Sequence, residues 1–279
     1  MIRNVFTFFL LLISVFAFSQ KKDSLKLKSK KGSFYFTFGY TRVMNFSNST
    51  IHFADLSNNY HSYTGKNNYY DFTIYDAKAT DKPDFDKIPD VLNITIPQFV
   101  IHAGYYFGKK KDMGIEFNYD HTKYVVDDNQ RVHIKGQFNN TYVDKDTTIN
   151  PQNFLHFEHT DGANFFIINF LKRWTLYNPS ERFNLNWVAK GGAGIVFPRT
   201  DVTLFGERLN NDWHVAGWIM GIESGLRAEF LRHGVFEFTA KGCYADYANS
   251  LVLGAGNGKA SHTFWCWQLT ATIGFMFGI

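Results

Sequence analysis

Apolar and polar residues alternate along much of this chain with a period of two. In residues 33–44, Phe34, Phe36, Phe38 and Tyr40 share one face, and small or polar residues occupy most of the other. Successive side chains of a β-strand point to opposite faces, so alternation of this length predicts a strand with one apolar and one polar face.

The C-terminal residues continue this alternation over a greater length. From Trp265 to Ile279 every second residue is apolar. Soluble strands usually have about five or six residues, whereas a tilted strand that crosses a bilayer needs about nine to eleven. The segment resembles the last strand of bacterial outer-membrane β-barrels, which ends in alternating apolar residues and a terminal aromatic or aliphatic side chain. Phe275, Phe277 and Ile279 match that pattern, with Ile where Phe is commoner.

Six further segments predict strands, at residues 93–107, 113–126, 160–174, 182–197, 214–230 and 235–248. With the two ends they make eight, a small even number typical of membrane barrels. Short connections (108–112, 175–181 and 231–234) alternate with long ones (45–92, 127–159, 198–213 and 251–261), as tight periplasmic turns and long outer loops require. The predicted fold class is all-β: an eight-stranded antiparallel up-and-down transmembrane β-barrel with long outer loops.

The N-terminus has the features of a secretory signal peptide over residues 1–19. Arg3 precedes an apolar run, and Ala17 and Ser19 supply the small residues needed for cleavage before Gln20. We therefore expect a cleaved signal peptide and a location in the outer membrane of a Gram-negative bacterium; an uncleaved anchor is the alternative. Residues 20–32, rich in lysine, predict a flexible tail, and residues 33–279 the barrel.

Composition narrows the function further. With 45% hydrophobic, 18% aromatic and 19% charged residues, the chain is not intrinsically disordered. A net charge of +4 without a basic stripe argues against a nucleic-acid partner. Cys243 and Cys266 are expected nearly opposite each other on neighbouring strands. A disulfide and two buried thiols are both open, and we favour the thiols because disulfide geometry is demanding.

Charged residues recur on the face opposite the apolar one in four of the predicted strands. They are Glu116, Lys190, Glu223, Arg227, Glu229, Glu237 and Lys241. An eight-stranded barrel is filled by its own side chains, so charges inside it should pair. We predict a salt-bridge network that plugs the lumen; a gated pore or a lumenal site is the alternative.

Aromatic residues cluster near the predicted strand ends, as in the girdles that mark both membrane interfaces. The expected outer girdle contains Trp213, Trp218, Trp265, Trp267 and Tyr247, and the inner one Trp174 and Tyr177.

A candidate chemical site lies near the outer strand ends. His121, His159 and Asp161 are candidates for acid–base catalysis or for binding a divalent metal ion, the one cofactor considered. Lys123 and Arg199 are candidates for binding a phosphorylated lipid headgroup. The alternative is that both histidines are ordinary polar residues at strand ends.

The stretches that carry these residues resemble a family of Gram-negative outer-membrane barrels that includes the lipid A oxidases. The matching motifs are Glu116, His121 and Lys123; Asp161, Gly162 and Asn164; and Gly192, Gly194 and Pro198. The resemblance covers residues 93–279 and departs at Arg199, where the family pattern has His, and in a longer first outer loop. It implies an enzyme that acts on lipid A.

Three hypotheses for function remain. We favour a non-enzymatic, monomeric envelope protein that is inserted by the barrel-insertion machinery and contacts outer-membrane lipid and lipopolysaccharide. The rival is a lipid A-modifying enzyme. The third is a secreted soluble barrel, which would keep apolar side chains inside and polar ones outside.

Overall fold

The computed structural model describes residues 32–55, 60–61, 66–67, 69–81, 98–108, 110–138, 141–159, 161–253 and 257–278. The predicted signal peptide lies outside these residues, as do the lysine-rich tail before Gly32 and the first residues of the strand expected over 93–107. Within the described part of the chain, no helix is long and apolar enough to cross a membrane.

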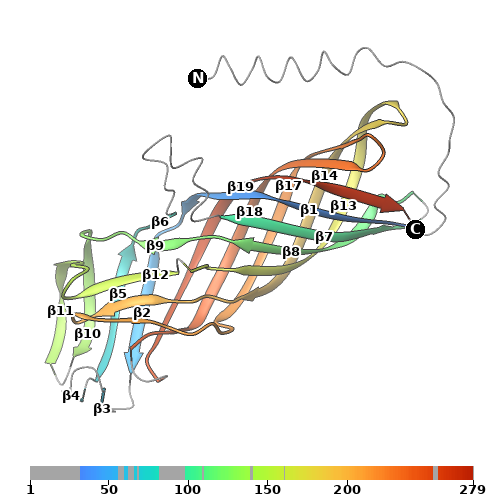
Figure 1. Cartoon of the computed structure of the whole chain (residues 1–279). Coiled ribbons are helices and arrows are strands. Elements are labelled where there is room, and N and C mark those ends of the chain that lie inside the picture. The colour runs from blue at the N-terminus through green and yellow to red at the C-terminus, as the bar shows by residue number, and fades with distance from the viewer. Residues whose placement is uncertain are drawn as a thin grey trace, which may run out of the picture. The chain divides into compact units, whose positions relative to one another are not determined.

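Eight long strands form a closed ring of antiparallel pairs (Figure 1). Each pairs with the next, and β1 also pairs with β19. The eight-stranded antiparallel up-and-down barrel is therefore confirmed. The strands are β1 (Ser33–Phe46), β7 (Phe99–Phe107), β8 (Met113–His121), β13 (Phe165–Ser180), β14 (Phe183–Val196), β17 (Gly217–Phe230), β18 (Gly234–Leu251) and β19 (Lys259–Gly278).

The barrel is apolar outside and charged inside. Phe36, Trp267 and Phe275 are 48%, 58% and 68% exposed, whereas Glu223 and Lys241 are only 3% and 2% exposed. A soluble barrel would have the opposite arrangement, so the hypothesis of a lipocalin-like secreted barrel is wrong. An apolar band around a polar interior is the surface that a membrane barrel presents to lipid.

Several strand boundaries differ from the sequence prediction, three of them with consequences for the site. The turn expected over 175–181 is strand: β13 runs to Ser180 with register shifts around Tyr177, which accommodate Pro179 in the ladder. The strand expected over 113–126 ends at His121, and β9 (Tyr124–Val126) leaves the ring to pair elsewhere. The strand expected from residue 160 begins at Phe165.

The connections expected to be long outer loops contain further strands, which we call the extension. Its first sheet continues from β19 through β2 (Ser49–Asp55), β5 (Tyr70–Ala77), β10 (Arg131–Phe138) and β11 (Thr141–Thr148). A second sheet has the order β16 (Glu207–Asn210), β15 (Asp201–Leu204), β12 (Leu155–His159), β9 and β6 (Ala79–Thr80). Two-residue strands β3 (Tyr60–His61) and β4 (Lys66–Asn67) pair with each other. The described parts of these connections are therefore largely strands rather than irregular loops.

The apolar core of the extension is continuous with one end of the barrel. Within the extension, the Phe53 ring stacks 5.1 Å from Phe72 and lies 5.3 Å edge-on from Phe157. At the junction, Tyr247 of β18 packs on two histidines that also contact each other, 4.8 Å from His159 of β12 and 4.9 Å from His262 of β19. Tyr247 is therefore buried, and its expected place in the outer aromatic girdle is wrong.

Candidate functional site

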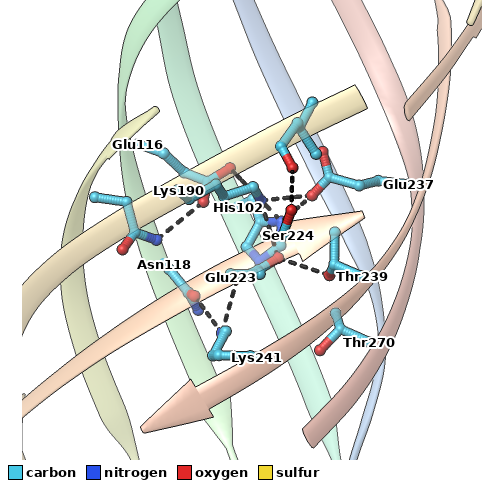
Figure 2. Close-up of polar contacts among 12 residues, drawn as sticks. His102, Glu116, Asn118, Lys190, Glu223, Ser224, Glu237, Thr239, Lys241 and Thr270 are labelled. Carbon is cyan, nitrogen blue, oxygen red and sulfur yellow. Dashed lines mark hydrogen bonds and ion pairs between the residues drawn. The ribbon is translucent and has the colours of Figure 1, made fainter. Parts of the chain in front are cut away.

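The barrel lumen holds a cluster of charged side chains that converge on one ammonium group (Figure 2). Lys190 Nζ of β14 lies 3.0 Å from Glu116 Oε2 of β8, 3.2 Å from Glu223 Oε1 of β17 and 2.5 Å from Glu237 Oε1 of β18. All four residues are buried. A buried charge needs partners because burial removes its hydration, and here each carboxylate has a cation within ion-pair distance.

Direct contacts in this cluster cross the full width of the barrel. Lys241 Nζ of β18 lies 2.7 Å from Asp120 Oδ2 of β8, four strands away around the ring. Arg227 of β17 donates a 2.6 Å hydrogen bond to the hydroxyl of Tyr106 of β7, which is also four strands away. Opposite walls of the barrel are therefore bridged by direct contacts between side chains.

Tyrosine rings complete the cluster on the side of β1. The Arg227 guanidinium lies 4.0 Å from the centroid of the Tyr35 ring and donates a 2.6 Å hydrogen bond to Glu237. The Tyr35 hydroxyl donates a 2.6 Å hydrogen bond to Glu116. The guanidinium thus has both a carboxylate partner and an aromatic face, which suits its planar shape.

The His102 side chain of β7 makes no hydrogen bond to the described residues of the cluster. Its Nδ1 lies 3.7 Å from Glu116 and 3.6 Å from Glu237, and neither ring nitrogen has a hydrogen-bond partner among the described residues. One nitrogen of His102 and one oxygen each of Glu116 and Glu223 lie within 4.8 Å of one another, a donor set that suits a divalent metal. Lys190 contacts both carboxylates, so the ammonium already fills the cation position.

The sequence predicted that Glu116, Lys190, Glu223, Arg227, Glu237 and Lys241 form a network, and the structure brings all six together. Glu229 pairs instead with Arg173 toward the other end of the barrel. Sequence reasoning missed His102, Tyr35 and Tyr106, and it assigned Asp120 to the outer strand ends. The missed signal is the alternation in 99–107, which puts His102 and Tyr106 on the inward face.

The candidate catalytic residues do not converge. His121 lies on the outward face of β8, where its ring stacks on Phe99 at 4.9 Å. His159 is fully buried in the core at the junction with the extension, and burial holds the pKa of its imidazole well below its usual value. Asp161 is exposed and pairs with Arg199 at 3.0 Å. His121 therefore faces outward from the barrel, whereas His159 is enclosed in the core.

Among the residues of the lipid A oxidase-like motifs, His121 contacts Asn164, whereas Glu116 belongs to the lumenal cluster. His121 Nδ1 donates a 2.8 Å hydrogen bond to Asn164 Oδ1, and Tyr119 donates one of 3.0 Å to the same oxygen. The Asn164 amide donates to the carbonyl oxygen of Phe197, next to Pro198. Asn164 has a positive φ of 39°, a conformation that asparagine tolerates. In this structure the motif fixes the point where β13 begins.

The two candidate headgroup-binding cations are also differently placed. Lys123 is buried just beyond the end of β8, at the point where the chain leaves the ring. Arg199 is partly buried, pairs with Asp161, and donates a further hydrogen bond to the carbonyl oxygen of Asn211. Neither is a free, exposed cation.

Cys243 and Cys266 lie directly opposite each other on β18 and β19, which agrees with their predicted near-opposition. Both thiols are free and buried.

The closed ring, its apolar exterior and the ion pairs inside it decide the fold type. The chain is an eight-stranded β-barrel of the outer-membrane type. No family model and no curated protein sequence matches it.

Solved structures of outer-membrane barrels resemble it slightly. The outer membrane protein OprG from Pseudomonas aeruginosa is 11% identical over 89% of this chain and 97% of its own, with a TM-score of 0.36. Ail, the attachment invasion locus protein of Yersinia pestis, is 9% identical over 88% and 99%, with a TM-score of 0.31. Neisserial surface protein A is 9% identical over 86% and 97%, with a TM-score of 0.27. No activity is carried over from likenesses of this size.

Proposed function

We propose that this protein is a sealed, non-enzymatic barrel of the Gram-negative outer membrane that holds the extension outside the cell. The carrying observation is the pair of contacts across the lumen, Lys241 with Asp120 and Arg227 with Tyr106. Eight strands leave room only for side chains, and here those side chains join opposite walls. Transport through the barrel would require these buried partners to separate, at a high cost.

The extension is the part of the chain suited to contacts with other molecules. Its core is as well buried as that of a soluble domain, with Phe53, Phe72 and Phe157 almost fully excluded from solvent. A folded, rigid structure presents a defined surface, which a flexible loop does not. We place the extension on the extracellular side, with the signal peptide of residues 1–19 removed on export.

Bilayer recordings test whether the barrel is sealed. The purified protein, inserted into planar lipid bilayers, should give no stepwise conductance at neutral pH. Steady conductance steps from the unaltered protein would contradict the proposal.

Surface labelling tests where the extension lies. Thr148→Cys in β11 and Ser180→Cys at the far end of β13 place thiols on opposite ends of the protein, while the two natural cysteines are buried. A maleimide that cannot cross the outer membrane should label Thr148→Cys on intact cells, and Ser180→Cys only after lysis. The reverse pattern would overturn the assignment.

A lipid A-modifying activity remains the rival, supported by the sequence motifs alone. Mass spectrometry of lipid A from a deletion strain and its complemented parent separates the two hypotheses. Identical lipid A profiles would support the non-enzymatic proposal, and a difference restored by complementation would refute it.

A further inference from the structure

The far part of the extension has an apolar hollow of about 290 Å³. It lies where the inner face of β10 and β11 meets two turns, the one before β12 and the one between β15 and β16. Its walls include Ile134, Phe138, Val143, Phe154 and Phe205, with Lys145 beside them. The hollow is shallow and open to one side, and its volume is just below the range for ligand pockets, so only a small molecule would fit it.

Three aromatic rings surround this hollow. Phe138 and Phe205 meet edge-on at 5.2 Å between centroids, and each lies 6.4 Å from Phe154. Phe138 and Phe154 are partly buried and Phe205 is exposed, unlike the buried Phe72 on which Phe138 packs at 4.7 Å. The aromatic surface that remains accessible is therefore available to an apolar ligand.

Phe205 reaches this position through an unfavourable backbone conformation. Its φ is +54°, and Gly206 after it has a φ of +87°. A two-residue turn with both φ angles positive normally takes Asn, Asp or Gly, and a bulky residue at the first position is an outlier. A backbone hydrogen bond from Phe205 to the carbonyl oxygen of Phe154 holds the turn in place. Strain of this kind accompanies binding sites more often than ordinary turns.

Lys145 brings a positive charge to the hollow. It lies directly opposite Ile134 in the ladder, on the same face of β11 as Val143, so it belongs to the inner face of the sheet. Its acidic neighbours Asp144 and Asp146 both bond to His133 on the other face. Within the described residues the Lys145 ammonium has no ion-pair partner.

We propose that this hollow binds a small organic carboxylate with an apolar body, such as an aromatic ring. The ring would lie against the accessible surface of Phe138, Phe154 and Phe205, and the carboxylate would pair with the Lys145 ammonium. This inference deepens the proposed function and rests on it, because a site in the extension is open to small molecules only from outside the cell.

Calorimetry on the full-length protein in amphipol tests this site, with 2-naphthoate as the probe and 2-naphthylmethanol as its uncharged counterpart. We expect saturable binding of one naphthoate per chain and at least tenfold weaker binding of the alcohol. Equal affinity for the two compounds, or no saturable binding of naphthoate, would overturn the proposal.

Three variants distinguish the contribution of the Lys145 charge to binding from that of the apolar hollow. Lys145→Gln should weaken naphthoate binding at least tenfold and leave the alcohol unchanged. Lys135→Gln is the matched control, because Lys135 lies on the other face of the same hairpin and pairs with Asp144 at 3.4 Å; its affinity should equal that of the unaltered protein. Val143→Trp should fill the hollow and abolish binding. Unchanged binding by Lys145→Gln would refute the site, while the conductance and labelling results would stand.

Discussion

The barrel and the extension apply the same period-two alternation with opposite polarity. In the barrel part of β19, Trp265 and Trp267 point outward and Gln268 points inward. Earlier in the same strand, Lys259, Ser261 and Thr263 occupy the outward face, and Ala260, His262 and Phe264 the inward one.

Strand β18 changes in the same place. Phe238 faces outward and Glu237 inward in the barrel, whereas Asp246 faces outward and Tyr247 inward near the extension. The change occurs beside the Cys243–Cys266 pair in both strands. Which face carries the apolar residues therefore depends on the surroundings: lipid contacts the barrel, and water contacts the extension. The point where the apolar face changes marks the membrane boundary.

The largest expected loss of stability follows from replacing Lys190, the lumenal cation that pairs with several carboxylates. Lys190→Met leaves Glu116, Glu223 and Glu237 without their shared partner, and breaking a buried ion pair costs about 3–5 kcal/mol. Lys172→Met is the control, since Lys172 pairs with Asp112 at 3.6 Å near the surface, where a pair contributes about 0–1 kcal/mol. For each variant, the loss of stability is measured as the drop in the temperature at which the folded band disappears in semi-native electrophoresis. Similar losses would show that the lumen is hydrated.

Phenylalanine truncation compares the two environments directly. Phe53→Ala opens a cavity in the extension core and should cost about 3–5 kcal/mol. Phe36→Ala on the barrel exterior should cost about 1–2 kcal/mol, because lipid tails fill the space that the ring leaves. Limited proteolysis reports the first change as cleavage within the extension, and electrophoretic mobility reports that the barrel stays folded. Cleavage that is equally rapid in both variants would contradict the comparison.

A lysine introduced on the outer surface of the barrel, and another on that of the extension, test whether the first surface contacts lipid and the second contacts water. Ile222 is 70% exposed near the middle of β17, and Ile222→Lys should cost about 2–4 kcal/mol because it places a charge in the bilayer. Tyr75→Lys on the outer face of β5 should change stability by less than about 0.5 kcal/mol, as for most surface substitutions. Urea titration of the protein folded into lipid vesicles measures the change in the free energy of unfolding for each variant. If Ile222→Lys folds as well as the unaltered protein, this face does not contact lipid.

The barrel could be predicted from the sequence because a strand that crosses lipid must be long and must carry apolar residues along one face. All eight of these strands were found, and the one-face apolar series of β1 and β19 was assigned to the outside. The extension was missed because its strands are short and mostly lie within connections that a barrel is expected to have. In β5, Tyr70, Phe72 and Ile74 alternate with polar residues, but the alternation is too short to distinguish a strand from the long loop expected there.

The lumen was also predictable in part. Charged residues between apolar ones identify the inward face from a single strand, so six members of the network could be named. Their partners could not be predicted, because contacts such as Lys241 with Asp120 depend on which strands face each other across a closed ring. The histidines at residues 121 and 159 failed as a site for a related reason, since their separation depends on which face each strand turns inward.

The smallest effect concerns an ion pair at the surface of the extension. His156 lies 3.3 Å from Glu158 and 2.8 Å from Asp128, and hydrogen bonds to these carboxylates raise the pKa of the imidazole to about 9. The folded state therefore holds this proton more tightly than the unfolded chain, whose histidine titrates near pH 6.5.

The stabilisation from this proton is fully present below about pH 6.5 and is lost as the pH rises through about 9. We expect a loss on the order of 1 kcal/mol, because the pair is partly exposed and screened by water. Urea midpoints of the extension, followed by circular dichroism, should fall between pH 6.5 and 9.5. His156→Gln is uncharged throughout, so it should show a smaller fall. Parallel curves for the two proteins would mean that His156 releases its proton at the same pH in both states, and would remove this contact from the forces that hold β12 in the extension.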